Sequence, residues 1–370
     1  MKVAIVCDWL LGTGGAERVV LELHRMYPKA PIYTSQYDPN PKLWYGDQWF
    51  EGADIRTGWL QKLPKSLKKF LPVFRAWYFS RLNLSGYDLV ISSSGAEAKG
   101  VKTGDKTMHI SYIHAPTHYY WERYEEYLEN PGFGFLDLPA RLALKLLVGP
   151  MRWWDKRAAR RPDYLIANSN YTKEQIAKYY GREAAVIHPP VDITRFKDHA
   201  KPAENRHGFI TAGRQTPYKK IDLAVQAAAL LNVPLIVIGR GPDHRKLKKL
   251  AGRSVTFLTK VSDESIAERF GEAKAFIFPG IDDFGIVAVE AMAGGTPVIA
   301  YKAGGALDYV NQDTGLFFDE QSPESLAKAM QDVDKKSFSP ARIIAHAAKF
   351  SPKAFQKNVD QLITKILRTR

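Results

Sequence analysis

The stretch FPGIDDFGIVAVEAMAGGTPVIAYKAGG, residues 278–305, decides the fold. It continues an apolar run that starts at 275 and is typical of a buried strand, and it then passes through two adjacent acids into a helical pattern at 284–293. Gly294 and Gly295 end the helix before Thr296 and Pro297, and a second strand pattern follows at 297–301. Strand, helix and strand in this order predict a βαβ unit in a parallel sheet.

The same alternation runs through most of the chain. The other strand patterns lie at 2–7, 87–94, 164–169, 208–213, 235–239 and 255–258. Because 370 residues exceed the usual size of one core, we expect two domains, and the polar segment 197–208 marks their junction. The predicted fold class is α/β, with two doubly wound, Rossmann-like domains and a cleft between them. Ligands of such sheets gather at the carboxyl ends of the strands.

Composition narrows the classes of partner. The net charge of +14 creates a positive field that attracts phosphates, nucleic acid or an anionic membrane surface. Cys7 is the only cysteine and cannot form an intramolecular disulfide, which fits a cytoplasmic setting. The apolar run in the first residues, MKVAIVCDWL, is too short for a signal peptide and is typical of a strand. No 18-residue apolar run occurs, so any membrane contact is expected to be peripheral.

A glycine-rich turn follows the first strand. Gly14 and Gly15 open a helix in LLGTGGAERVVLEL, but Glu17 stands where a dinucleotide-binding turn has its third small residue. A nicotinamide site is therefore a poor match. The turn suits an anion or a closely packed sugar at a helix N-terminus, and the alternative is a tight βα turn without a ligand.

A second strand end is basic. In GRQTPYKKIDLAV, Arg214 follows a strand and Lys219 precedes the next helix. Such cations suit a diphosphate, since the arginine fork matches phosphate oxygens. The alternative is a solvated basic loop.

The acidic exit loop of the opening stretch offers further groups. Asp282 or Asp283 can cap the following helix, and the first four helical residues would present backbone amides to an anion: Phe284, Gly285, Ile286 and Val287. Glu290 lies on an otherwise apolar helix and needs a partner. The hydroxyls of a ribose are one possible partner, and a buried salt bridge is the other.

Seven segments together resemble the retaining family-4 glycosyltransferases of the GT-B fold, and most closely the bacterial mannosyltransferases that assemble O-antigen and other surface polysaccharides. They cover nearly the whole chain: DWLLGTGGAERVVLELHRMYP, YDLVISSSGAEAKGV, SYIHAPTHYYW, YLIANSNYTKEQIAKYYGREAAVIHPPVD, GRQTPYKKIDLAVQA, IGRGPDHRKL and FPGIDDFGIVAVEAMAGGTPVIAY. The resemblance implies an acceptor-binding domain at 1–197, a donor-binding domain at 198–350, and a final segment, 351–370, that crosses back to the first domain.

The resemblance also implies roles for individual residues. Arg214 and Lys219 would hold the donor diphosphate, and Glu290 would hold the ribose. Backbone groups around Lys260 and Val261 would receive the base. Asp282 would lie beside the donor sugar, although the family usually has Glu there. His114, in SYIHAPTHYYW, matches the histidine that projects toward the transferred sugar; the alternative for a histidine in this setting is a packed or capping residue.

The expected chemistry needs neither a metal nor a cofactor. No Asp-x-Asp motif stands at a strand end, and no His or Cys cluster has metal-ligand spacing. Protein cations would therefore neutralise the leaving diphosphate. The resemblance implies retention of anomeric configuration, most simply through attack on the face from which the phosphate leaves.

Two basic segments with apolar stripes predict contact with an anionic membrane. Residues 59–81 carry Leu60, Leu63, Leu67, Phe70, Leu71, Phe74 and Trp77 with basic residues and no acid, and residues 140–161 form a second basic and aromatic patch. The alternative is helices packed on the first domain with a solvated basic face. A lipid-linked acceptor on the inner face of the cell membrane would explain both segments.

The leading hypothesis is a transferase that moves a hexose, namely mannose from GDP-mannose, to a saccharide acceptor. This acceptor would be linked to a polyprenyl lipid and would serve surface polysaccharide biosynthesis. Alternatives are a transferase that uses a UDP-sugar and a non-catalytic protein that binds nucleotide sugars or polyanions. Nucleic acid is disfavoured as a partner because no DNA- or RNA-binding motif occurs.

Overall fold

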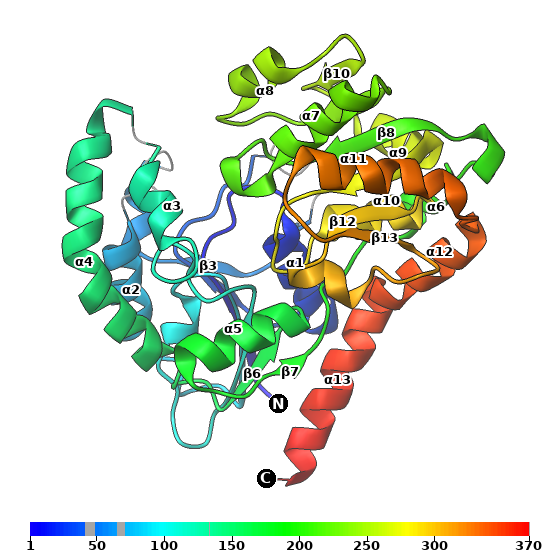
Figure 1. Ribbon diagram of the computed structural model, residues 1–370. Helices are drawn as coiled ribbons and strands as arrows, with labels where there is room; N and C mark the ends of the chain where they lie inside the picture. Colours follow the sequence, from blue (N-terminus) through cyan, green and yellow to red (C-terminus); the bar gives the residue numbers. More distant parts are fainter. Residues whose placement is uncertain (41–48, 65–70, 133, 370) are drawn as a thin grey trace. The chain divides into compact units, whose positions relative to one another are not determined.

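The structure is a computed structural model that describes residues 1–40, 49–64, 71–132 and 134–369. The chain forms two compact units: unit 1 comprises Met1–His188 and Val359–Arg370, and unit 2 comprises Pro189–Asn358. Each unit contains one sheet whose paired strands are all parallel, and helices accompany both sheets (Figure 1). The predicted class, α/β with two doubly wound domains, is confirmed.

The sheet of unit 1 has seven strands in the order β3-β2-β1-β4-β5-β6-β7. Its strands are β1 (Val3–Cys7), β2 (Ile32–Thr34), β3 (Ile55–Thr57), β4 (Leu89–Ser94), β5 (Met108–Ile113), β6 (Tyr164–Ala167) and β7 (Ala185–Val186). The helices of unit 1 are α1 (Gly15–Met26), α2 (Pro72–Arg81), α3 (Tyr124–Glu129), α4 (Asp137–Ala158) and α5 (Asn170–Tyr180). The order of the strands along the sheet reverses between β1 and β4.

The sheet of unit 2 has six strands in the order β10-β9-β8-β11-β12-β13. Its strands are β8 (His207–Ala212), β9 (Leu235–Ile238), β10 (Val255–Leu258), β11 (Ala273–Phe278), β12 (Val298–Tyr301) and β13 (Gly315–Phe318). The helices are α6 (Thr194–Lys197), α7 (Ile221–Leu231), α8 (His244–Leu250), α9 (Asp263–Glu272), α10 (Ile286–Ala293), α11 (Pro323–Asp332) and α12 (Pro340–Ala347). Here the order reverses between β8 and β11, and such a switch point is where ligands of doubly wound sheets bind.

The division into units falls at Pro189, upstream of the polar segment 197–208. The reason is packing: Val191, Ile193 and Phe196 are buried in the core of unit 2 with Phe270 and Phe276. The last helix, α13 (Pro352–Thr369), begins in unit 2, and its residues from Val359 onward are counted with unit 1.

The glycine pair after α10 is explained by a buried arginine. The Arg206 guanidinium donates to the carbonyl of Gly294 (2.8 Å) and to the Thr296 hydroxyl (2.6 Å), and its burial lowers the pKa of Arg206 to about 10. Gly295 has φ 73°, and a Cβ there would lie 2.8 Å from the Arg206 guanidinium and 2.9 Å from Pro340. Only glycine therefore lets the chain turn from α10 into β12 at this point.

Two buried ion pairs hold the helices of unit 1 against the loop that follows β4. Lys99 pairs with Asp155 of α4 (2.7 Å), and Arg75 of α2 pairs with Glu97 (2.7 Å). Hydrogen bonds complete both pairs: Asp155 also accepts from Trp121 and Tyr180 (2.7 and 2.8 Å), and Glu97 also accepts from Tyr119 (2.7 Å). Charges buried in this way cost little only when every polar atom has a partner, so these residues fix the positions of α2 and α4.

In the described ranges of the chain, none of the helices combines the length and the apolar character that crossing a bilayer requires.

Candidate functional site

Two predicted site residues meet at the switch point of unit 2. Lys219 ends a short 3-10 helix, η7 (Pro217–Lys219), in the loop that follows β8, and Asp282 lies in the loop that follows β11. Their side chains form an ion pair and are 19% and 13% exposed. The Lys219 ammonium also lies 5.5 Å from the ring centre of Tyr218 and 5.9 Å from that of Phe278. A positive charge half enclosed by aromatic rings is poorly hydrated. The carboxylate of Asp282 therefore helps to stabilise the charged form of Lys219.

Glycines bring the loops of this switch point into contact. A Cβ on Gly280 would lie 2.6 Å from the Tyr218 carbonyl oxygen and 2.9 Å from Lys219 Cα. A Cβ on Gly305, in the loop after β12, would lie 2.3 Å from Phe284 Cα, and the Gly305 amide donates to the Asp282 carbonyl (2.8 Å). The backbones of Lys219 and Asp282 are therefore both fixed by residues that cannot carry a side chain.

Helix α10 begins at Ile286, two residues later than predicted. Gly285 occupies the N-cap position with φ 90° and has no side chain to cap the helix, so neither Asp282 nor Asp283 is the N-cap residue. A Cβ on Gly285 would lie 2.5 Å from the Phe278 ring and 2.7 Å from the Tyr309 hydroxyl oxygen. Left-handed backbone and crowding explain why glycine stands here. The first turn of α10 presents the amides of Ile286 and Val287 at the positive end of the helix dipole.

The neighbouring predicted residues of α10 differ in accessibility. Phe284 is 3% exposed, and its ring packs against Tyr309 and Phe350 (5.4 and 5.5 Å between ring centres), so its side chain belongs to the core. Glu290 is half-buried in the second turn of α10.

Exposed cations stand at the carboxyl ends of three adjacent strands of unit 2. Arg214 follows β8, Arg240 follows β9 and Lys260 follows β10; all three are exposed, and no described residue forms an ion pair with any of them. Val261 is partly buried, and its side chain packs against the core. The sequence analysis did not single out Arg240, although its place directly after the predicted strand 235–239 is a signal that could have found it.

In unit 1, His114 lies directly after β5. Its Nε2 atom is 2.8 Å from the hydroxyl of Ser93 on the neighbouring β4, and its ring lies 5.2 Å from that of Tyr112. The His114 carbonyl accepts a hydrogen bond from Asn168 (2.8 Å). The side chain is half-buried, so it is held in place and still accessible at the carboxyl edge of the sheet.

The glycine turn after β1 has the predicted geometry of a helix start. Gly14 is the N-cap of α1 and Gly15 is its first residue. A Cβ on Gly14 would lie 2.6 Å from the Glu17 carboxylate. Glu17 thus folds back over the turn, close to the position that a bound anion would take.

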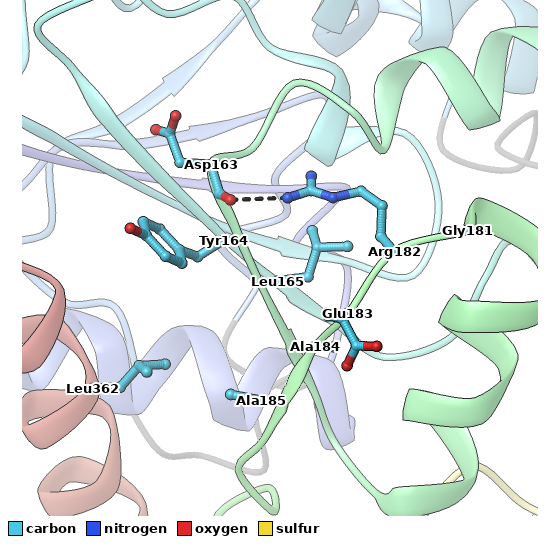
Figure 2. A pocket seen from close by; sticks show the side chains of 9 residues that line it. All are labelled: Asp163, Tyr164, Leu165, Gly181, Arg182, Glu183, Ala184, Ala185 and Leu362. Atoms are coloured by element: carbon cyan, nitrogen blue, oxygen red, sulfur yellow. Dashed lines mark hydrogen bonds between the residues drawn. The ribbon is translucent and has the colours of Figure 1, made fainter.

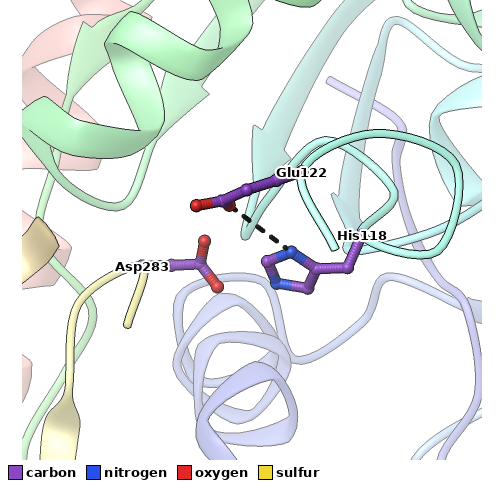
Figure 3. A group of neighbouring side chains, drawn as sticks. All are labelled: His118, Glu122 and Asp283. Carbon is purple, nitrogen blue, oxygen red and sulfur yellow. Dashed lines mark ion pairs between the residues drawn. The ribbon is translucent and has the colours of Figure 1, made fainter. Parts of the chain in front are cut away.

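A second histidine of unit 1 pairs with an acid. His118 Nδ1 lies 3.8 Å from Glu122 (Figure 3). The hydroxyl of Tyr171 donates to the same carboxylate. Asp283, which Figure 3 also draws, belongs to unit 2. Within either unit taken by itself, the described part of the chain brings no three His, Cys, Asp or Glu side chains close enough to share one metal ion.

Unit 1 also contains a pocket of about 590 Å³ that includes none of the predicted site residues. It lies along β6 and β7. Figure 2 shows the residues that line it, among them Arg182, which precedes β7, and Leu362, which belongs to α13. The Arg182 guanidinium donates to the carbonyls of Ala159, Pro162 and Asp163 (2.8, 2.6 and 2.8 Å). Because this cation is already bound by the backbone, it holds the pocket wall together.

An apolar surface covers the outer faces of α2 and α4, which pack together through Ala76, Met151 and Trp154. Its most exposed members are Leu138 (76%), Leu142 (59%), Leu146 (69%) and Trp153 (64%) of α4 and Phe74 (52%) and Trp77 (47%) of α2. The exposed basic residues of these helices are Arg81, Arg141, Lys145, Lys156 and Arg157. Of the predicted stripe, Leu67 and Phe70 lie outside the described residues. We refer to this set of α2 and α4 side chains as the apolar ledge.

Comparison with protein families gives two matches that follow one another along the chain. Residues 13–195 match the model described as Glycosyltransferase Family 4, and residues 192–350 match the model described as Glycosyl transferases group 1.

Two similar curated proteins differ in how much of this chain they match. A D-inositol 3-phosphate glycosyltransferase of Streptomyces avermitilis is 31% identical over 221 residues, which is 50% of this chain and 47% of that protein, so the match spans about half of the relative's length. The human alpha-1,3/1,6-mannosyltransferase ALG2 is 25% identical over 413 residues, and this match covers 96% of this chain and 94% of ALG2.

Solved structures share the fold. The crystal structure of Anabaena HepE in complex with UDP superposes with a TM-score of 0.70 at 18% identity, covering 99% of this chain and 100% of that one. Sucrose-phosphate synthase of Thermosynechococcus elongatus superposes with a TM-score of 0.65 at 19% identity over the full length of both chains.

Proposed function

Because the chain belongs to the glycosyltransferases whose two domain models together match residues 13–350, we propose that it transfers mannose from GDP-mannose to a saccharide acceptor. The proposed reaction retains the anomeric configuration and needs no metal. The observation that carries the proposal is the cationic switch point of unit 2, where Lys219 and Arg214 stand at the carboxyl end of β8. The similarity to ALG2, a mannosyltransferase, along nearly the whole chain supports mannose as the sugar.

In the proposed reaction, unit 2 holds the donor. Arg214, Lys219 and the first amides of α10 bind the diphosphate and stabilise the charge that develops on it as the glycosidic bond breaks. A donor aimed at developing charge is worth about 2.7 to 4 kcal/mol in the transition state. Glu290 binds the ribose, and the backbone at Lys260 and Val261 receives the base.

The acceptor hydroxyl attacks the anomeric carbon on the face from which the diphosphate departs. The departing phosphate oxygen takes the proton of the attacking hydroxyl, so no separate general base is required. Within this proposal Asp282 contacts the donor sugar and His114 of unit 1 interacts with the transferred sugar. The half-buried, hydrogen-bonded setting of His114 supports this role, because its ring is oriented before the substrate binds.

We further propose that the acceptor is lipid-linked, as in surface polysaccharide synthesis, and that the protein works on the inner face of the cell membrane. The support is the apolar ledge of unit 1. Exposed leucines at positions 138, 142 and 146 share one side of α4, and exposed Arg141 and Lys145 flank them. Leucines that insert among acyl chains and cations that face anionic head groups are the usual means of peripheral attachment.

The test of the enzymatic function starts with the donor. The protein is incubated with GDP-mannose, UDP-glucose and ADP-glucose, and the release of each nucleoside diphosphate is measured. We expect GDP release from GDP-mannose, unchanged by a chelator, and loss of release in Lys219→Ala but not in Lys246→Ala, an exposed lysine of the same unit that pairs with Asp222. Faster release of UDP than of GDP would instead favour a transferase that uses a UDP-sugar. If nucleotides bind but no donor releases its nucleotide, a non-catalytic binding protein would be favoured.

A further inference from the structure

The ion pair between Lys219 and Asp282 bridges the loops of the two strands that flank the switch point of unit 2. The two residues are 63 positions apart in the sequence, and glycines fix both backbones: Gly280 packs under Lys219, and Gly305 donates to the Asp282 carbonyl. The pair is thus built into the fold of unit 2 and is not a chance contact of two mobile side chains.

The surroundings explain why Lys219 needs a counterion. Its ammonium lies near the rings of Tyr218 and Phe278, and only 19% of its side chain is exposed. An ammonium that has lost most of its water is costly without an anion beside it. Asp282 supplies that anion as long as no phosphate is bound.

We propose that Asp282 is the built-in counterion of Lys219 and competes with the diphosphate for it, so that the spent nucleotide is bound weakly and leaves quickly. This inference rests on the proposed function, because it assumes that a nucleoside diphosphate binds at Lys219. It is separate from the sugar contact proposed for Asp282, because it acts through Lys219 and concerns the product, which has no sugar.

The physical argument is one of charge. The diphosphate brings at least two negative charges to a site that already holds a carboxylate next to the cation. Binding therefore weakens the existing ion pair and places like charges close together, which costs free energy in a half-buried site. When the diphosphate dissociates, the Asp282 carboxylate pairs with the Lys219 ammonium again. Asp282 is thus a positioning residue that sets how tightly the site holds phosphate.

The experiment measures the affinity and the dissociation rate of GDP, with UDP in parallel, for the wild type and for Asp282→Asn. The amide keeps the size of the side chain and removes its charge. We expect Asp282→Asn to bind GDP about tenfold more tightly, equal to about 1.4 kcal/mol, mainly through slower dissociation. The gain should shrink as salt rises, because it arises from charge. Asp282→Glu, which keeps the charge, should bind GDP as the wild type does.

Two further variants separate this role from a general effect of charge. Asp222→Asn removes one negative charge from the same unit, but Asp222 pairs with Lys246 and should leave GDP affinity unchanged. In a Lys219→Ala background, Asp282→Asn should tighten binding much less, because the competed cation is gone and only the repulsion between like charges remains. Thermal unfolding of each variant verifies that it is folded.

The proposal is overturned if Asp282→Asn binds GDP no more tightly than the wild type, if Asp222→Asn gains as much, or if the gain is as large without Lys219 as with it. A wild-type protein that binds neither GDP nor UDP overturns it as well. Failure of the proposed function looks different: nucleotide binding and its response to Asp282→Asn would be intact, while no sugar is released from any donor.

Discussion

The two units arrange the strands around their switch points in the same order, but they fill those switch points differently. In unit 1, the Asp8 carboxylate follows β1 and accepts hydrogen bonds from the amides of Gly95, Ala96 and Ala98 (2.8, 3.0 and 2.7 Å) in the loop after β4. Asp8 is 8% exposed. In unit 2, the corresponding place holds the Lys219–Asp282 pair, the exposed Arg214 and the start of α10 at Gly285.

The difference shows how one topology serves two purposes. Backbone amides that gather at a strand end form a place for an anion, and in unit 1 a carboxylate of the protein itself occupies that place. In unit 2 the N-cap residue of α10 is a glycine, which has no side chain to occupy such a place, and Arg214 at the end of β8 remains exposed. We infer that charge at the switch point of unit 1 stabilises the fold, whereas charge at the switch point of unit 2 binds a ligand.

The largest effect is expected when the anion of unit 1 is removed. Asp8→Ala leaves three amides without their acceptor, and hydrogen bonds to a charged group contribute about 1.5 to 3 kcal/mol each. Even at the lower value, unit 1 should lose about 4.5 kcal/mol of stability. Urea unfolding measures the loss. Asp54→Ala, which breaks the exposed pair with Arg56 in the same unit, should cost less than about 1 kcal/mol.

A stable but inactive Asp8→Ala protein would contradict the comparison, because it would mean that the switch point of unit 1 serves the reaction and not the fold.

The next largest effect concerns turnover. Lys219→Ala should lower the rate of sugar transfer about 10²- to 10³-fold, which corresponds to about 2.7 to 4 kcal/mol of transition-state stabilisation. Its unfolding midpoint should change far less than that of Asp8→Ala, since Lys219 is partly exposed and lies in a loop. Steady-state kinetics with GDP-mannose measure kcat and KM separately. A rise in KM with an unchanged kcat would show that Lys219 binds the donor equally in the ground state and the transition state.

The membrane contact should respond to single leucines of the apolar ledge. Leu142→Asp or Leu146→Asp removes a side chain whose full burial is worth about 1.5 to 3 kcal/mol, so binding to vesicles should fall at least about tenfold. Co-sedimentation with vesicles of phosphatidylglycerol and phosphatidylcholine at low salt measures this. Leu230→Asp is the matched control, because Leu230 of α7 is 61% exposed but lies in unit 2. Equal losses for all three variants would refute the ledge as the contact surface.

Much of the fold could be predicted because buried strands leave a clear mark. The apolar runs at 235–239 and 255–258 correspond to β9 and β10, and 275–280 overlaps β11. The sequence analysis does not predict β5, because MHISYI alternates apolar residues with polar ones that the structure buries. The Ser92 hydroxyl donates a hydrogen bond to the Ser111 hydroxyl inside the sheet, and no local sequence pattern predicts such a contact.

The candidate site could be predicted in its parts but not in its pairing. The positions of Lys219 and Asp282 at strand ends follow from the strand patterns, whereas their ion pair depends on two loops that meet only in the folded unit. The start of α10 is misplaced for a similar reason: the conformation of Gly285 and the crowding by Phe278 and Tyr309 come from tertiary structure. Roles carried over from the resemblance, such as that of His114, stay predictions.

The smallest expected effect is a change of stability with pH. It tests whether a second buried polar group of unit 1, His109, serves the fold. His109 on β5 is fully buried, with Nε2 2.9 Å from the Ser92 hydroxyl, and burial together with Arg161 and Arg182 lowers the pKa of His109 to about 3. The unfolded chain takes up a proton below about pH 6.5, whereas the folded protein does so only near pH 3. Stability should therefore fall as the pH decreases through this window.

Between pH 7.5 and pH 5.5 His109 should account for about 1.4 kcal/mol of lost stability, or a few degrees in the unfolding midpoint. His109→Gln cannot take up the proton, so its midpoint should depend less steeply on pH than that of the wild type, even if it is lower at neutral pH. His24→Gln serves as a control of the same unit, because His24 is less buried and its pKa is lowered less by its surroundings. Parallel pH profiles of wild type and His109→Gln would show that the folded protein accepts the proton at His109, and the polar interior of unit 1 would then be more open to water than its hydrogen bonds indicate.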